Sequence, residues 1–484
     1  MAILENYEPQ KVFHYFEEIC RIPHGSGNTK QISDYLVNFA QEHNLKYVQD
    51  ELNNVVIYKP AAPGYENAPT VILQGHMDMV CAAHPEAEHD FTKDGLKLVV
   101  KDGFLSAEGT TLGGDDGIAV AYGLALLDST ELPHPALEVV FTVDEETGLL
   151  GAAGFDCSLL KGRRMINLDS EKEGCLWVSC AGGIAGNSYL PVRRVEAAGR
   201  KISVKICGLT GGHSGAEIHK SRANANILMG RFLYELADVC GYALKDLEGG
   251  QQDNVITKEC VATLLVLPEE VVTIQETAKK IQRDLRQEYS GTDDNITIKV
   301  TEEGNEDAQV LHPTSQEKVI FYLMNMPFGV KKMSGTMEGL VETSSNPGIL
   351  KLYGDELFVQ TSIRSSVGSA KEALSHKVQY LTEFLGGEYE TEGAYPAWEY
   401  RKDSPLRDKM VEVYKNMFGK ELNVVAVHAG LECGLFYEKM DHLDCTSLGP
   451  DILDIHTYKE RLDMSSVKRV WEYLTEVLKN LKDE

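Results

Sequence analysis

The spacing of hydrophobic residues divides the first 170 positions into helices and short strands. Apolar side chains recur every three or four positions in residues 10–20 and 30–43, which predicts two amphipathic helices. Residues 46–58 predict a hairpin. Predominantly apolar runs of strand type occupy residues 71–75, 137–143 and 165–168. Helical segments lie between some of these strands, so the pattern predicts a mixed α/β sheet between helices.

Acidic residues or a histidine follow each of these apolar runs. His76 and Asp78 follow the first run, Asp144–Glu146 the second and Asp169 the third. Three consecutive acids would be harmless on a solvated loop. At the carboxyl ends of strands, where ligands gather in open α/β sheets, a bound cation explains them better.

A glycine-rich loop contributes two further acids. Asp115 and Asp116 lie between Gly114 and Gly117, directly before a helix of small residues. Two acids in this position would also suit simple capping of the helix. Glycines on both sides let the backbone come close to an ion, and carboxylates together with imidazoles are ligands that suit zinc.

The middle of the chain has a different pattern, in which strands and helices alternate twice. Strands are predicted at residues 200–206, 261–267, 296–300 and 349–363, and helices at 223–236, 271–288, 317–324 and 371–385. The repeated succession predicts an α+β insert of two similar halves. The first pattern returns after residue 395. We therefore expect one domain formed by residues 1–187 and 396–484, interrupted by a domain of residues 188–395.

Composition narrows the class of protein. A formal net charge of −27 over 484 residues argues against nucleic acid and anionic membrane surfaces as partners. Ten cysteines without a C-x-x-C pair make a thiolate zinc knuckle a poor explanation. The first ten residues lack a signal-peptide pattern, and no apolar run approaches the roughly 20 residues of a membrane span. The expectation is a cytoplasmic protein.

Several motifs together resemble a known family. H-M-D, G-G-D-D-G, D-E-E-T-G, N-L-D-S-E and G-G-H-S-G, followed by a late histidine, resemble the co-catalytic dizinc metallopeptidases of the aminoacylase and carboxypeptidase type. The segments L-V-E-T-S-S-N, S-I-R-S-S and H-A-G-L-E-C-G look closest to the branch that hydrolyses Xaa-His dipeptides. The resemblance extends nearly end to end. It implies a zinc-peptidase catalytic domain interrupted by an α+β lid domain of two ferredoxin-like halves.

The family pattern implies a set of metal ligands in this sequence. His76 and Asp169 would bind one zinc ion, and Glu146 and His456 would bind the other. Asp115 would bridge the two ions, and the peptide bond after it would be cis. Cobalt or manganese could substitute for zinc at such a site.

Three further residues are implied to assist the reaction. Asp78 would orient the ring of His76. Glu145 would take a proton from zinc-bound water and pass it to the leaving nitrogen, although a purely supporting role beside the ligands is the alternative. His213 would stabilise the oxyanion, from the same chain or from a second copy. Two metal ions would hold a hydroxide and polarise the scissile carbonyl.

A small peptide is the implied substrate. Asn254 and Arg364 are candidates to bind its terminal carboxylate, since Arg can do so with two parallel hydrogen bonds. Glu432 could meet the free amino terminus or a histidine ring. The insert offers a surface for a homodimer, which the sequence leaves open. Thr457 and Tyr458 replace the Ser-Pro of many relatives, so the loop after His456 could differ in shape.

Other functions are compatible with the same ligands. A broader dipeptidase or tripeptidase, or an N-acyl amino acid deacylase, would belong to the same family. A metal-dependent binding protein without catalysis belongs to another class, but Glu145 and His213 beside a full ligand set argue against it.

Overall fold

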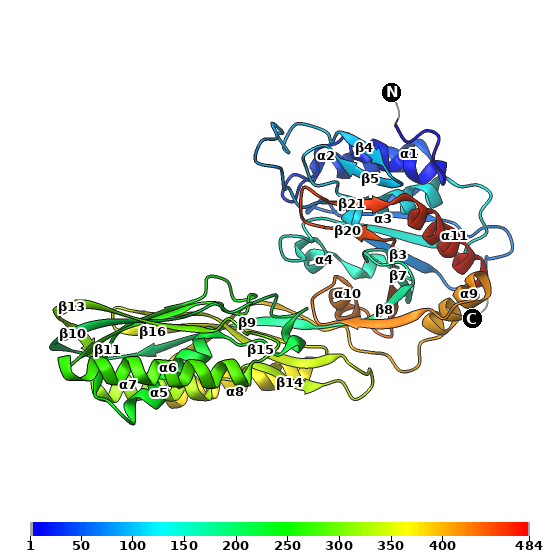
Figure 1. Ribbon diagram of the computed structural model, residues 1–484. Coiled ribbons are helices and arrows are strands. Elements are labelled where there is room, and N and C mark those ends of the chain that lie inside the picture. Colours follow the sequence, from blue (N-terminus) through cyan, green and yellow to red (C-terminus); the bar gives the residue numbers. More distant parts are fainter. Residues whose placement is uncertain (1–2, 483–484) are drawn as a thin grey trace. The chain divides into compact units, whose positions relative to one another are not determined.

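The computed structural model describes residues 3–482. Positions 1, 2, 483 and 484 of the predicted domain lie outside the described residues. The chain forms two compact units (Figure 1). We call one the α/β unit, which comprises Met1–Cys180, Tyr400–Ala426 and Leu431–Glu484. The other is the insert unit, which comprises Ala181–Glu399 and Val427–Gly430. The division into functional domains at residues 187 and 395 stays a proposal.

The α/β unit is built on a mixed sheet of eight strands. In spatial order these are β1 (Lys46–Gln49), β2 (Val55–Lys59), β6 (Leu137–Thr142), β3 (Val71–His76), β7 (Arg164–Asn167), β19 (Asp444–Ser447), β8 (Cys175–Cys180) and β18 (Asn423–Val427). β3 pairs in parallel with both β6 and β7. The carboxyl ends of these three strands therefore lie at one edge of the sheet, as the sequence predicts.

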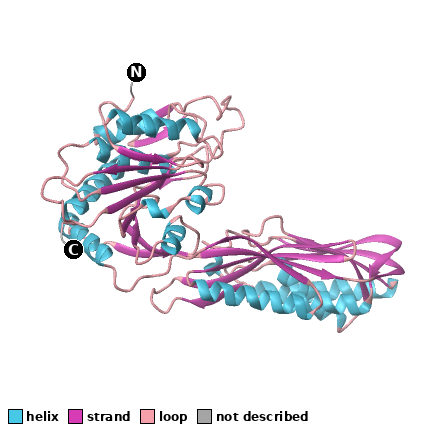
Figure 2. Cartoon of the chain, turned by 180° about the vertical axis from the view of Figure 1, so that it is seen from behind, coloured by secondary structure: helices cyan, strands magenta, loops and turns pink. Residues whose placement is uncertain are grey.

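Helices pack against this sheet (Figure 2). They are α1 (Gln10–Ile19), α2 (Lys30–Glu42), α3 (Gly114–Asp128), α4 (Leu150–Gly154), α9 (Pro405–Phe418), α10 (Cys433–Lys439) and α11 (Met464–Asn480), with a 3₁₀ turn at Cys157–Leu159. α3 packs against β3 and α1, and its residues from Gly114 to Leu127 are all buried. Gly117 packs closely against α1, because an added Cβ would lie 3.2 Å from Ile19 Cδ1 and 3.3 Å from Phe16 Cε2. The small residues of α3 thus serve close packing on all sides.

A second, four-stranded sheet in the same unit carries the late histidine. Its order is β20 (Ile452–Leu453), β21 (Arg461–Asp463), β5 (Phe104–Ala107) and β4 (Leu98–Lys101). β4 and β5 form a hairpin with Asp102 and Gly103 at its turn. The loop between the antiparallel strands β20 and β21 contains His456. This sheet therefore joins a segment near residue 105 to one near residue 460.

The insert unit consists of one large antiparallel sheet and four long helices. The spatial order is β13 (Thr297–Leu311), β10 (Arg194–Cys207), β12 (Cys260–Val266), β11 (Tyr242–Gly249), β15 (Val341–Tyr353), β16 (Glu356–Ser365), β9 (Gly182–Pro191) and β17 (Glu388–Tyr395), and β14 (Gly329–Met333) pairs with β15. The helices are α5 (Ala225–Ala237), α6 (Val271–Glu288), α7 (Pro313–Asn325) and α8 (Gly368–Phe384), with 3₁₀ turns at Ile218–Lys220 and Pro268–Glu270.

Two ferredoxin-like halves make up this unit, which confirms the prediction. One half runs β10-α5-β11-β12-α6-β13 and the other β9-α7-β15-β16-α8-β17. In each half the fourth strand lies beside the first, then the third, then the second. The sequence suggested that the halves follow one another along the chain, but the structure shows that they do not. The first is nested between β9 and α7 of the second, and pairing of β11 with β15 joins them.

Several strands were not predicted from the sequence, and their composition gives the reason. β17 has the sequence E-Y-E-T-E-G-A-Y and is mostly exposed, so it lacks the apolar alternation of a half-buried strand. β9 contains three glycines, which strand propensity disfavours. Pairing with neighbouring strands forms both elements.

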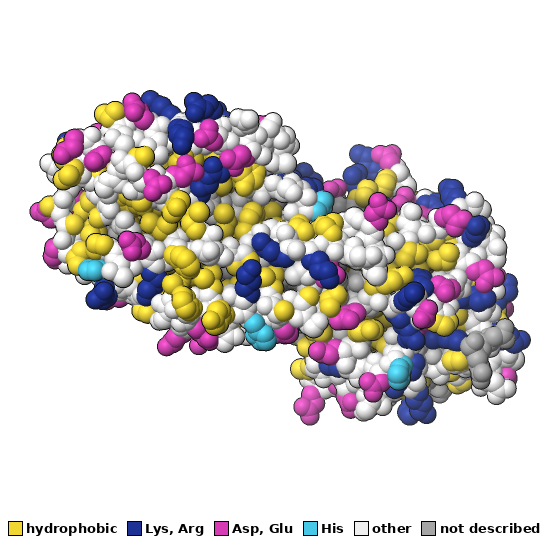
Figure 3. Space-filling model, turned by 90° about the horizontal axis from the view of Figure 1, so that it is seen from below, with side chains coloured by type: hydrophobic (Ala, Val, Ile, Leu, Met, Phe, Trp, Pro, Cys, Tyr) yellow, Lys and Arg dark blue, Asp and Glu magenta, His cyan; other side chains and the backbone are white. Residues whose placement is uncertain are grey.

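Hydrophobic side chains gather on the helical face of the insert unit (Figure 3). The most exposed are Tyr380 at 70% and Phe384 at 72%, both on α8. A groove of about 470 Å³ lies on α5 and α7, lined among others by Tyr234, Phe321 and Met324. In the described residues no helix has the length and apolarity of a membrane span.

The contact of β3 with α3 yields a stability prediction. A Cβ at Gly75 would lie 2.4 Å from Ala119 Cβ and 2.5 Å from Asp116 Oδ2. Gly75→Ala should therefore lower the free energy of unfolding by about 1–3 kcal/mol, because a packed interface must shift. The matched control is Gly241→Ala, where an added Cβ meets nothing within 4 Å. Denaturant unfolding measures both variants, and equal stability of the two would contradict this packing.

Candidate metal centre

Three loops that follow parallel strands converge at one edge of the α/β sheet. His76 is the last residue of β3, Glu146 follows β6 and Asp169 follows β7. Backbone hydrogen bonds continue the pairing beyond the strand ends, from Met77 N to Thr142 O at 2.8 Å and from Leu168 N to Gln74 O at 2.8 Å. The ladder of the sheet thus fixes where each loop begins.

Asp115 stands between two histidines that are 380 positions apart. His76 Nε2 lies 3.2 Å from Asp115 Oδ1, and His456 Nε2 lies 3.1 Å from Asp115 Oδ2. His456 Nε2 is also 3.1 Å from Glu146 Oε1, and His76 Nε2 is 3.7 Å from Asp169 Oδ1. Each oxygen of Asp115 therefore faces a different imidazole, which is the arrangement of a bridging carboxylate.

The donor groups fit metal ions. Within residues 3–482, ligand atoms that lie within 4.8 Å of one another form three groups, namely His76, Asp116 and Asp169; His76, Glu145 and Glu146; and Asp115, Glu146 and His456. Glu146 Oε1 is buried and makes no well-oriented hydrogen bond. Carboxylates and imidazoles gathered in this way suit a pair of divalent cations. The peptide bond after Asp115 is cis, as expected.

Asp78 holds the ring of His76. His76 Nδ1 lies 3.0 Å from the backbone oxygen of Asp78 and 3.3 Å from its Oδ1. Asp78 is fixed in turn, because its Oδ2 accepts a hydrogen bond from Ser26 Oγ at 2.8 Å and its Oδ1 accepts one from Glu145 N at 3.1 Å. With Nδ1 engaged in this way, Nε2 faces the ligand cluster.

Burial is costly for the acids of this cluster. It raises the pKa of Asp116 and of Asp169 well above the usual range, and Asp116 adds to the shift of Asp169. Burial also raises the pKa of Glu145 to about 8, against the opposing effect of His76. Bound cations would favour the ionised form of all three carboxyl groups.

The two imidazoles respond to the same negative charge. Burial alone would lower the pKa of His76, but the carboxylates of Asp169 and Asp115 raise it well above its usual value. Close contacts with the carboxylates of Asp115 and Glu146 raise the pKa of His456 to about 10. Without cations, protonated histidines therefore balance part of the charge, and a divalent ion would replace those protons.

A buried polar network lies beneath the cluster. Glu432 Oε2 accepts hydrogen bonds from Gln74 Nε2 at 2.5 Å and Thr142 Oγ1 at 2.6 Å. Gln74 Oε1 accepts one from Asn167 Nδ2 at 2.6 Å, and Asn167 Oδ1 accepts one from Asp169 N at 3.2 Å. The Glu432 side chain is completely buried, and its Oε1 has no hydrogen-bond partner. Its role towards the substrate stays a prediction.

The set of ligands and supporting residues predicted from the sequence did not include two acids of this region, Asp116 and Glu460. Asp116 joins one of the three ligand groups and also accepts a hydrogen bond from His76 N at 3.2 Å. Glu460 binds the backbone of the Asp115 loop through its carboxylate. The D-D pair gave a signal for Asp116. Glu460 had none, because only the tertiary structure brings it to residue 115.

The predicted residues of the insert unit form a cluster of their own. Ser214 N donates a hydrogen bond to Asn254 O at 2.8 Å, which ties the loop of His213 to Asn254. Arg364 Nη1 donates one to Tyr395 Oη at 2.7 Å, while its buried Nε has no partner.

Gly215 permits the close approach of these groups. A Cβ at this position would lie 3.0 Å from His213 Cε1 and 3.2 Å from Arg364 Nε. The predicted residues of the insert unit therefore share one small region of that unit.

The hydrogen bonds of His213 define its tautomer. Nδ1 accepts the backbone N–H groups of Gly215 and Ala216 at 3.2 and 3.0 Å. Burial and the nearby Arg364 lower the pKa of the ring, which favours the neutral form. The proton of a neutral ring must then reside on Nε2, so His213 presents a hydrogen-bond donor.

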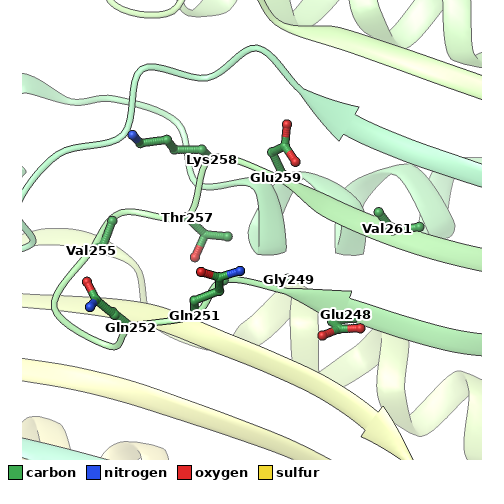
Figure 4. Close-up of a pocket in the computed structure, with 10 residues that line it drawn as sticks. Glu248, Gly249, Gln251, Gln252, Val255, Thr257, Lys258, Glu259 and Val261 are labelled. Atoms are coloured by element: carbon green, nitrogen blue, oxygen red, sulfur yellow. The ribbon is translucent and has the colours of Figure 1, made fainter. Parts of the chain in front are cut away.

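A pocket in the insert unit adjoins these residues, because its lining includes Val255, which forms a β-bridge with His213. It has a volume of about 510 Å³ and lies at the turn between β11 and β12 (Figure 4). Gln251, Gln252, Lys258 and Glu259 line it together with backbone of the turn. None of the three ligand groups found in the described residues includes a residue that lines it.

The fold and the clustered ligands define a metal-dependent hydrolase with an α/β unit and a ferredoxin-like insert. The family model described as "Peptidase family M20/M25/M40" matches residues 72–480. The chain belongs to this family and is a peptide hydrolase.

Similar proteins match along the whole length of the chain. The cytosol non-specific dipeptidase of Escherichia coli (strain K12) is 36% identical over 483 residues, which are 99% of both proteins. The crystal structure of aminoacylhistidine dipeptidase from Vibrio alginolyticus has a TM-score of 0.93 and 36% identity, covering 98% of this chain and 97% of that one. A tripeptidase from Staphylococcus aureus shares the fold, with a TM-score of 0.56 and 17% identity over 99% of this chain and 100% of that one.

Removal of metal ions should destabilise the α/β unit. The clustered acids then lose their compensating charge, and a site held at about 100 times its dissociation constant loses about 2.7 kcal/mol of stability on chelation. Tm should fall on treatment with EDTA and recover when Zn²⁺ is restored. Differential scanning calorimetry measures this effect. An unchanged Tm, with no zinc bound by elemental analysis, would contradict the metal centre.

Proposed function

We propose that this peptidase hydrolyses dipeptides with a free amino terminus, including Xaa-His dipeptides such as carnosine. The observation that carries the proposal is the convergence of His76, Asp115, Glu146, Asp169 and His456 in one cluster. The full-length similarity to an aminoacylhistidine dipeptidase supports the substrate class.

The proposed site holds two divalent cations, which we take to be zinc. His76 and Asp169 would bind one and Glu146 and His456 the other, with Asp115 between them. When bound, such ions polarise the scissile carbonyl and lower the pKa of a water molecule. Asp78 keeps His76 Nε2 directed at the site through its contacts with Nδ1.

Glu145 is the proposed general base. It lies beside the ligand Glu146, and its backbone is held by Asp78. Its carboxylate would take a proton from the attacking water and then deliver that proton to the leaving nitrogen. Burial raises the pKa of Glu145 to about 8, and bound cations would favour the ionised form, which can accept a proton.

Residues of the insert unit have proposed roles in substrate binding. Arg364 has an unpaired buried Nε, which suits a terminal carboxylate. Asn254 would assist it. His213 would donate a hydrogen bond from Nε2 to the oxyanion, in keeping with its neutral tautomer. Glu432 would act on the amino-terminal side of the substrate.

Two related substrate classes differ from the main proposal, namely a strict Xaa-His dipeptidase and an N-acyl amino acid deacylase. The Escherichia coli relative is named a non-specific dipeptidase, which favours a range wider than Xaa-His. An N-acyl amino acid deacylase would not require a free amine. The name of the Escherichia coli relative also supports a cytosolic location. A homodimer that buries the helical face of the insert unit is a further, separate proposal.

Replacement of the proposed general base should abolish turnover. Glu145→Gln removes the proton acceptor, so kcat should fall by about 10²–10⁴-fold while two metal ions remain bound. Elemental analysis and steady-state kinetics measure the two effects. Glu138→Gln is the matched control, because Glu138 is a buried acid at the other end of β6. Turnover of Glu145→Gln within a few-fold of wild type would refute the role.

A substrate panel separates the three classes. Carnosine and Leu-Gly should both be hydrolysed, whereas their N-acetylated forms should lose at least about 100-fold in kcat/KM, because a site built for an ammonium group leaves polar groups unpaired. Cleavage of carnosine alone would indicate a strict Xaa-His enzyme. Preferential cleavage of the acetylated compounds would indicate a deacylase and overturn the proposal.

A further inference from the structure

Glu460 binds the backbone of the segment that ends in Asp115. Its side chain is buried, and its two oxygens accept hydrogen bonds from four consecutive backbone N–H groups. Oε2 accepts from Leu112 at 2.7 Å and Gly113 at 3.0 Å, and Oε1 accepts from Gly114 at 2.8 Å and Asp115 at 3.2 Å. One carboxylate therefore satisfies a whole turn of donors.

These donors lie at the amino terminus of α3, where backbone N–H groups have no partner within the helix and carry partial positive charge. Asp115 and Asp116 have non-helical backbone angles, so the first turn is irregular as well. Without Glu460, the free N–H groups could bind a neighbouring carboxylate of the same segment, such as that of Asp115. Glu460 occupies the donors, which leaves both oxygens of Asp115 to the two histidines.

The loop between β20 and β21 contains both the proposed ligand His456 and Glu460. Glu460 lies four residues after His456, and its N–H donates to Thr457 O at 3.0 Å. Thr457 Oγ1 donates in turn to Asp454 O at 2.7 Å, so the loop is internally braced. β21 begins directly after Glu460 and pairs with β5. Anchoring Glu460 at residues 112–115 thereby fixes His456 relative to Asp115.

We propose that Glu460 is a positioning residue, which holds Asp115 and His456 in the geometry that binds the second cation. This inference rests on the two-metal centre of the proposed function. It assigns Glu460 no contact with metal or substrate. The expected consequence of its loss is unequal for the two ions, since His456 faces only the Glu146 side of the site, whereas Asp115 faces both histidines.

Zinc titration of the metal-free full-length protein tests this role by calorimetry. Glu460→Gln keeps the shape but presents only one acceptor oxygen, so it cannot satisfy all four N–H groups. The affinity for one of two zinc equivalents should fall at least tenfold, and the affinity for the other should fall by a smaller factor.

The control is Glu138→Gln, since Glu138 is also buried and accepts backbone N–H groups of Lys161 and Gly162 at 3.0 Å. It should lower Tm but leave both zinc affinities unchanged. A general loss of stability would therefore not imitate the predicted unequal effect.

The outcomes distinguish this inference from the proposed function. If wild type binds fewer than two zinc ions, the two-metal centre itself is wrong. If wild type binds two and Glu460→Gln binds both with unchanged affinity, only the role of Glu460 is refuted. Should Glu460→Gln fail to fold, Glu460→Asp keeps the charge and withdraws the carboxylate. Wild-type affinities in Glu460→Asp would equally overturn the role.

Discussion

The compensation of buried negative charge is the constraint on which this structure depends. Asp115, Asp116 and Asp169 are almost entirely buried at one edge of a sheet, and Glu145 and Glu146 lie beside them. A buried carboxylate without a partner is strongly unfavourable. Two imidazoles, those of His76 and His456, each contact a different oxygen of Asp115 and offset part of this charge. The arrangement of these donors also suits cations in the same place.

The fold serves this constraint by making the supports of the site rigid. Parallel pairing of β6, β3 and β7 gives three loops a common origin, while a small antiparallel sheet returns the chain so that His456 reaches Asp115. α3 is packed tightly enough against β3 that Gly75 leaves no room for a side chain. The ligands thus rest on strands and helix ends, where small displacements are resisted.

Much of this arrangement could be predicted from the sequence, because its signals are local. Apolar runs that end in His76 or Asp169 mark strand ends, and the periodicity of residues 271–288 marks α6 with the bounds that the structure shows. The nested order of the insert halves could not be predicted, because it depends on β9 pairing with β16 and β17 far along the chain. The contacts of Glu460 could not be predicted for the same reason, because the N–H groups that it binds lie about 345 positions earlier in the sequence.

The position of bound metal tests the account most directly. Crystals of the zinc-loaded protein, measured at wavelengths on both sides of the zinc edge, would locate each ion by anomalous scattering. The account predicts two peaks about 3.5–4 Å apart, one beside His76 and Asp169 and one beside Glu146 and His456, with Asp115 between them. A single peak, or peaks away from these five side chains in fully loaded crystals, would contradict it.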